Sequence, residues 1–212
     1  FPNCITYGIS PENDYNAENI RYSEDGMSFT VISAGEAVEF TTDLIGEHNA
    51  QNILGAIAVS HKLGVPLKDL VARVKKLKPV AHRLEIQRNK DYTVIDDSYN
   101  SNPQGAKMAL EILSSFDGYK IIITPGMVEL GEKQYELNFA FGKQIAATCD
   151  AVFLVGKSQT QSIYEGIVSA GYNMDNVYVV PSFQDAMSAA KAFITGDKKK
   201  VILIENDLPD NY

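Results

Sequence analysis

The stretch Tyr92-Thr-Val-Ile-Asp-Asp-Ser-Tyr-Asn-Ser-Asn-Pro-Gln104 decides how the second part of this chain folds. It begins as a short apolar run of the kind that forms a buried strand. It then becomes polar and reaches Pro103, which suits the first turn of a helix because its ring fixes φ and its missing N–H would be unpaired there. A strand, a polar turn and a helix start place side chains at the carboxyl edge of a sheet, where open α/β folds bind ligands.

Beyond this stretch, apolar runs alternate with amphipathic segments. We predict helices over 104–116, 132–148, 159–170 and 183–194, and strands over 120–123, 151–155, 177–180 and 201–204. Strands that are apolar throughout, separated by such helices, indicate a parallel sheet covered on both faces. The runs 84–86 and 92–95 flank a turn and are predicted to pair as a hairpin. The fold class is therefore α/β, with a Rossmann-like domain and a mostly parallel sheet over 81–212.

Residues 1–80 have a different pattern. Alternation over 4–7, 27–32 and 37–40 predicts a small antiparallel sheet. Helical periodicity follows over 48–63, with Gly64 as the candidate C-cap, and Pro66 opens a second helix that Pro79 closes. We therefore predict a domain boundary near residues 78–82.

Composition bounds the class of protein. The chain has 212 residues, 45% of them hydrophobic and 22% charged, as in an ordinary soluble globule. A net charge of −8 disfavours nucleic acid or an anionic membrane as the main partner. Cys4 and Cys149 lack metal or disulfide spacing, which fits a reducing cytoplasm. From the cysteines we expect a cytoplasmic protein, and because no apolar run approaches the roughly 18 residues of a membrane span, we expect no membrane insertion.

Four segments carry a resemblance to one family. Asp97-Ser-Tyr-Asn-Ser-Asn-Pro103 resembles the D-x-Y-N-x-N-P signature of the MurF-type Mur ligases. Three other segments resemble the same family in the same order: Gly46-Glu-His-Asn-Ala-Gln-Asn52, His82-Arg-Leu-Glu85 and Gly126-Met-Val-Glu-Leu-Gly-Glu132. The resemblance implies a ligase of peptidoglycan precursor synthesis that uses ATP and Mg²⁺. Its substrates would be a UDP-muramoyl-tripeptide and D-alanyl-D-alanine, joined through an acyl phosphate. Residues 1–80 would then be the end of the central ATP-binding domain, and 81–212 the C-terminal ligase domain.

The resemblance also implies nucleotide contacts. Asn49 and Asn52 share a helix face, and an amide can pair with the edge of adenine; capping and a core hydrogen bond are the alternatives. Arg83 would reach the nucleotide from the C-terminal domain when the domains close, whereas a salt bridge to Glu85 is the alternative. Asp97 would contact the nucleotide by accepting ribose hydroxyls or orienting a cation, unless it only forms a turn.

Acceptor contacts are implied for the turn that follows. Asp96 and Asp97 are adjacent on a strand, so their side chains should point in opposite directions. The family's loop faces the incoming amino acid or dipeptide, which implies substrate contacts for Tyr99, Asn100 and Asn102. A helix N-terminus could hold the acceptor's carboxylate. The alternative for Asn102 is an N-cap, a role that can coexist with binding.

One feature of the family is missing. The sequence contains no G-x-x-x-x-G-K-[ST] phosphate-binding loop. The resemblance places that loop and the magnesium ligands upstream of the matched part, so no catalytic residue or metal ligand is assigned here. We expect the chain alone to bind nucleotide weakly and to lack ligase activity.

Several alternatives stay open. A Mur-type ligase for another amine, such as glutamate or an ammonia-derived amide, is kept open by Thr124–Gly126, which replaces the family's L-G-D, and by the divergent tail 205–212. A non-catalytic nucleotide-binding module and a purely structural α/β domain are the others. The sequence gives no indication of oligomeric state.

Overall fold

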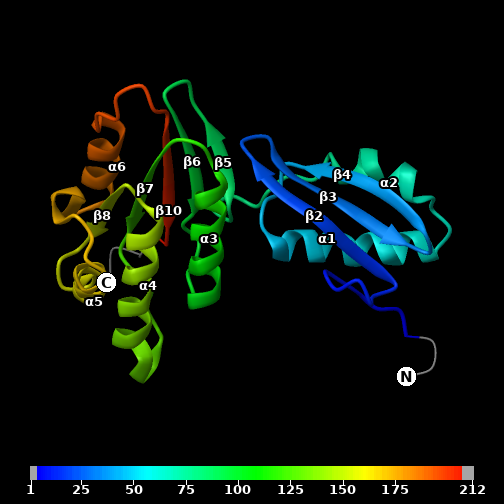
Figure 1. The fold of residues 1–212 in the computed structure, drawn as a ribbon, viewed down its shortest axis with the longest axis horizontal. Coiled ribbons are helices and arrows are strands. Elements are labelled where there is room, and N and C mark those ends of the chain that lie inside the picture. Colours follow the sequence, from blue (N-terminus) through cyan, green and yellow to red (C-terminus); the bar gives the residue numbers. More distant parts are fainter. Residues whose placement is uncertain (1–3, 207–212) are drawn as a thin grey trace. The chain divides into compact units, whose positions relative to one another are not determined.

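A computed structural model describes residues 4–206 and divides the chain into two compact units, Phe1–Pro79 and Val80–Tyr212 (Figure 1). None of the helices in the described range combines the length and apolar character needed to cross a membrane.

The first unit is a four-stranded sheet with two helices. Its elements are β1 (Tyr7–Gly8), β2 (Tyr15–Ser23), β3 (Gly26–Ser33), β4 (Glu36–Thr42), α1 (Glu47–Lys62) and α2 (Leu67–Val74). The strands lie in chain order; β2, β3 and β4 are antiparallel, whereas β1 pairs with β2 in parallel. Gly64 follows the end of α1 with a φ of 97°, a left-handed conformation that glycine adopts without steric cost.

The core of this unit follows from alternation. Met27, Phe29 and Val31 point inward from β3, and the ring of Phe29 stacks on its register partner Phe40 in β4. The prediction missed β2 and placed the first strand too early. In β2 the register shifts between Glu18 and Arg21, so a bulge breaks the alternation that would reveal the strand.

The second unit is the α/β domain that the sequence predicts. Its strands are β5 (Glu85–Arg88), β6 (Tyr92–Asp97), β7 (Tyr119–Thr124), β8 (Ala151–Val155), β9 (Val177–Val180) and β10 (Lys200–Glu205). Its helices are α3 (Pro103–Ser115), α4 (Gln134–Thr148), α5 (Gln161–Ser169) and α6 (Phe183–Ala192), with short 3₁₀ turns η1 (Gly131–Lys133) and η2 (Met174–Asn176). The helix predicted over 132–148 therefore begins two residues later than predicted, because residues 131–133 form a 3₁₀ turn.

The sheet order is β5-β6-β10-β7-β8-β9, and every pair is parallel except the predicted hairpin of β5 with β6. The last strand therefore returns to the middle of the sheet, between β6 and β7. This insertion was not predicted. It places the end of the described chain beside the polar turn that follows β6.

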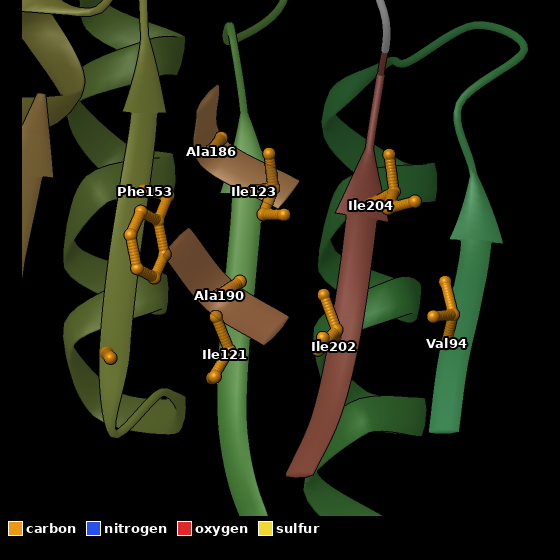
Figure 2. Close-up of a cluster of buried hydrophobic side chains, with 9 residues drawn as sticks. Val94, Ile121, Ile123, Phe153, Ala186, Ala190, Ile202 and Ile204 are labelled. Carbon is orange, nitrogen blue, oxygen red and sulfur yellow. The ribbon is translucent and has the colours of Figure 1, made fainter. Parts of the chain in front are cut away.

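Both faces of this sheet are covered. Figure 2 shows α6 on one face of the sheet, where the small side chains of Ala186 and Ala190 let the helix lie close to the strands. Other helices lie behind the strands in the same view. The buried residues of this cluster alternate along the strands: Val94, Ile121, Ile123, Ala151, Phe153, Ile202 and Ile204. The intervening residues, such as Ile122 and Leu203, are fully buried toward the other face. Burial on both faces explains why the strands are apolar throughout.

Candidate functional site

The turn after β6 leads directly into α3. Asn102 has an extended backbone, and its side-chain oxygen accepts a hydrogen bond of 3.0 Å from the Gly105 N–H. Pro103 is the first helical residue. The N-cap alternative for Asn102 is therefore correct. The side chains of Asn100 and Asn102 are exposed.

The segment before β5 packs against this turn. The Tyr99 N–H donates to the His82 carbonyl at 3.0 Å, and the Arg83 guanidinium carbon lies 4.3 Å from the centroid of the Tyr99 ring. Arg83 and Glu85 both lie within the described residues and form no ion pair there. Arg83 instead lies over an aromatic face. The Tyr99 side chain remains 63% exposed, so this cation–π pair lies at the surface.

The two adjacent aspartates contact different groups, as expected for side chains on opposite faces of a strand. Asp96 is buried and accepts from the Ser98 hydroxyl at 2.7 Å, with His82 Nδ1 at 3.0 Å. Asp97 accepts from the Leu84 N–H at 3.1 Å. The backbone of the segment before β5 is therefore fixed to the end of β6 by Asp97, and its histidine by Asp96.

Asp97 is electrostatically unusual. Burial raises its pKa from 3.8 to about 6; the Leu84 hydrogen bond opposes this shift, the Asp96 carboxylate adds to it, and Arg83 opposes it. A carboxylate with few hydrogen-bond donors in a partly buried setting is a strong acceptor for donors from a ligand, such as hydroxyl groups.

Sequence reasoning missed two residues at the end of β10. Glu205 is 1% exposed, lies in register with Asp97, and accepts a 2.6 Å hydrogen bond from the buried Ser101 hydroxyl. Burial raises the pKa of Glu205 well above its usual range, and the Asp97 carboxylate raises it further. Asn206 donates from its backbone to the Asp97 carbonyl at 3.2 Å and from its side chain to the Gly126 carbonyl at 2.7 Å. The only sequence signal was a Glu-Asn pair directly after an apolar run.

The loop that begins at Gly126 is held from two sides. Its first peptide group accepts from Asn206, and the buried side chain of Asn138 in α4 pairs with both the N–H and the carbonyl of Met127, at 2.9 Å each. A Cβ on Gly126 would lie 2.9 Å from the Asn138 side chain, so glycine allows this close approach. The ends of β6, β7 and β10 thus meet at one edge of the sheet.

The two predicted adenine contacts belong to the first unit. Asn49 is half-buried on α1 and donates to the Ile45 carbonyl at 2.8 Å, while Asn52 is exposed. The N-cap of α1 is Gly46, so neither asparagine caps the helix. His61 from the same helix pairs with the buried Tyr15 hydroxyl at 2.8 Å, which gives this histidine a structural partner.

Two further findings concern ligand sites. Within residues 4–206, no group of three or more His, Cys, Asp or Glu side chains could hold a metal ion. A cavity of about 720 Å³ lies between the end of β9 and the start of α5 and includes none of the predicted site residues. It is lined by Lys157, Thr160, Gln161, Tyr164, Val179, Val180 and Pro181.

Comparison with known proteins identifies the family. Residues 82–205 match the family described as Mur ligase, glutamate ligase domain, and residues 1–60 match the Mur ligase middle domain. The UDP-N-acetylmuramoyl-tripeptide–D-alanyl-D-alanine ligase of Haemophilus influenzae is 34% identical over 133 residues, which cover 62% of this chain and 29% of that protein. The Bacillus subtilis enzyme of the same name is 32% identical over 156 residues, 72% of this chain and 34% of that protein.

Solved structures agree on the fold. A MurF structure from Acinetobacter baumannii superposes with a TM-score of 0.78 at 22% identity, over 96% of this chain and 43% of that one. A MurF ligase from Thermotoga maritima in complex with ADP gives 0.75 at 19% identity, over 96% and 45%. The chain thus spans about a third of the length of the curated relatives it matches. Because one family model covers more than half of it, the chain belongs to the Mur ligase family.

Proposed function

We propose that this chain is part of an ATP-dependent amide ligase that joins D-alanyl-D-alanine to a UDP-muramoyl-tripeptide. The observation that carries the proposal is the arrangement at the carboxyl edge of the second unit: Arg83 lies on Tyr99, and the segment that holds Arg83 is hydrogen-bonded to Asp97. A fixed cation, a carboxylate and an exposed helix start can hold a nucleotide and an anionic acceptor. The ligase names of the relatives support the same assignment.

The chemistry assigns a role to each side chain. In the complete reaction the substrate carboxylate takes the terminal phosphoryl group of ATP, which releases ADP and forms an acyl phosphate. The amine of the acceptor attacks the acyl carbon, phosphate leaves, and the amine loses a proton. Arg83 would neutralise phosphate charge and Asp97 would accept ribose hydroxyls. Asn49 and Asn52 would contact adenine.

The acceptor would bind at the start of α3. Pro103 has no N–H and the Gly105 N–H donates to the Asn102 side chain, so the carboxylate would bind at the Gln104 N–H and the positive end of this 13-residue helix, with Tyr99, Asn100 and Asn102 in the preceding turn. Holding the amine and the acyl phosphate in attack geometry is the main contribution of this domain. Mg²⁺, when bound with ATP, would neutralise phosphate oxygens; its ligands are proposed to lie upstream of this chain. We also propose a cytoplasmic location.

A second candidate differs only in the amine. The chain is 34% identical over 108 residues to a ligase from Halalkalibacterium halodurans whose name specifies 2,6-diaminopimelate. A Mur-type ligase with an acceptor other than D-alanyl-D-alanine is therefore the second candidate.

Product formation by the full-length protein tests both candidates. The protein would be supplied with ATP, UDP-muramoyl-tripeptide and a panel of amines, with ADP release and product mass measured. We expect turnover with D-alanyl-D-alanine, and Arg83→Ala should raise the KM for ATP at least tenfold. Arg88→Ala is the matched control, since Arg88 is an exposed arginine at the end of β5. Turnover with another amine alone would select the second candidate, and no amide product with any amine would refute both.

A further inference from the structure

Glu205 is a buried carboxyl group with one oxygen that has no hydrogen-bond partner among the described residues. It is the last residue of the central strand β10, and only 1% of its surface is exposed. One carboxyl oxygen accepts from Ser101; the other, Oε2, is buried and has no hydrogen-bond partner within residues 4–206. A buried acid with an unpaired oxygen destabilises a fold, so a role other than stability would explain why this residue is present.

The position of Ser101 suggests that role. Ser101 lies in the middle of the turn between β6 and α3, and its hydroxyl is the buried anchor of that turn. Its neighbours on both sides, Asn100 and Asn102, are exposed, as is Tyr99. Ser101 therefore fixes the turn from beneath, next to the exposed side chains of Tyr99, Asn100 and Asn102.

The end of β10 makes further contacts to the same region. Glu205 is the register partner of Asp97, and the next residue, Asn206, bonds the Asp97 carbonyl and the Gly126 carbonyl. Parallel neighbours in register place their side chains on the same face of the sheet. Glu205 therefore lies beneath the turn and beside the proposed nucleotide contact.

We propose that Glu205 is a positioning residue, whose carboxyl group fixes the Ser101 hydroxyl and thereby holds the 98–102 turn in its acceptor-binding conformation. This inference rests on the proposed function for its consequence, but not for its geometry. Glu205 performs this role as an un-ionised acid. Ionisation would place a second negative charge in the interior next to Asp97, with no donor facing Oε2.

The geometry can be tested on the 212-residue chain without any ligase assay. Infrared spectroscopy at neutral pH should show the carbonyl stretch of an un-ionised carboxyl group that disappears in Glu205→Gln. Glu165→Gln is the matched control, because Glu165 is only partly buried, is hydrogen-bonded and has a lowered pKa. Backbone amides in the 98–102 turn should exchange hydrogen faster in Ser101→Ala and Glu205→Ala, but not in Glu205→Gln. Ser115→Ala, which removes a similar hydroxyl at the far end of α3, should leave that exchange unchanged.

The functional consequence is tested in the full-length ligase. Ser101→Ala and Glu205→Ala should raise the KM for the amine by about 2-fold to 10-fold, the range for one lost hydrogen bond, without a matching change for ATP. Glu205→Gln should stay within about 2-fold of the wild type, because a neutral amide can replace a neutral acid. Absence of the infrared band, unchanged exchange in Ser101→Ala, or Glu205→Gln as impaired as Glu205→Ala would overturn the proposal. An inactive wild type would instead refute the proposed function.

Discussion

Replacing Asp97 by asparagine should stabilise the second unit while it removes the proposed nucleotide contact. Asparagine has nearly the same shape, and its side-chain oxygen can still accept from the Leu84 N–H. What changes is the charge. The folded protein raises the pKa of Asp97 to about 6 from 3.8, chiefly by burial. Ionised Asp97 therefore costs stability, and asparagine cannot ionise.

The size and pH window follow from linkage. A pKa that is higher in the folded state than in the unfolded state gives a penalty that is absent below the unfolded pKa of 3.8, grows as the pH rises, and is complete above about 6. A shift of about 2 units corresponds to about 3 kcal/mol at 1.36 kcal/mol per unit. The weaker hydrogen bond to a neutral acceptor reduces this gain, so we expect Asp97→Asn to add about 1–3 kcal/mol at pH 7.5 and almost nothing at pH 4.

Urea unfolding at these two pH values and equal ionic strength measures the effect. Asp91→Asn is the control, because Asp91 is an exposed aspartate next to the same hairpin. Destabilisation by Asp97→Asn at pH 7.5, or an equal effect at pH 4, would contradict the raised pKa of Asp97. The proposed function predicts that the same substitution raises the KM for ATP of the full-length protein, so that stability and activity change in opposite directions.

Three other predictions test the fold around the site. Asn102→Ala should lower the free energy of unfolding by about 1 kcal/mol in a urea titration, whereas Asn102→Asp, which also caps, should not. Gly166→Ala should lower it by about 1–3 kcal/mol, because the new Cβ would lie 2.1 Å from the Phe139 carbonyl oxygen where α5 meets α4; an unchanged urea midpoint would show that the helices can separate freely. A thiol reagent followed by mass spectrometry should label exposed Cys4 in the native protein and Cys149 only after unfolding, because Cys149 is buried and burial raises the pKa of its thiol; rapid double labelling would contradict this packing.

Much of the second unit was predictable because its signals are local. Apolar runs such as 120–123 need no distant partner to indicate a strand buried on both faces. Asn102 before Pro103 gives the start of α3 from two adjacent residues, and the structure confirms it. The predicted hairpin of β5 and β6 also forms from neighbouring segments.

The parts that failed depend on long-range pairing or on broken patterns. The position of β10 between β6 and β7 depends on which strands pair with each other, and no residue in 200–205 indicates those pairing partners. Without that order, Glu205 could not be matched to Asp97, so the sequence did not predict that these two carboxyl groups are neighbours. β2 was missed for a different reason, since its bulge at residues 18–21 interrupts the period of two.

The carboxyl edge of the second unit also concentrates backbone strain, which supports a functional site without reference to the relatives. Within residues 80–206, the non-glycine residues with a left-handed backbone are His82, Leu84, Glu129 and Asn206, with φ between 49° and 66°. His82 and Leu84 lie before β5, which is antiparallel and so begins at this edge; Glu129 follows β7, and Asn206 follows β10. Such residues cost about 1–3 kcal/mol each and persist only where the surrounding structure determines them. The opposite edge of the sheet has none among the described residues, although it is built from the same strands. A fold under selection for stability alone would have no reason to collect these conformations, together with the ionisable Asp97, at a single edge.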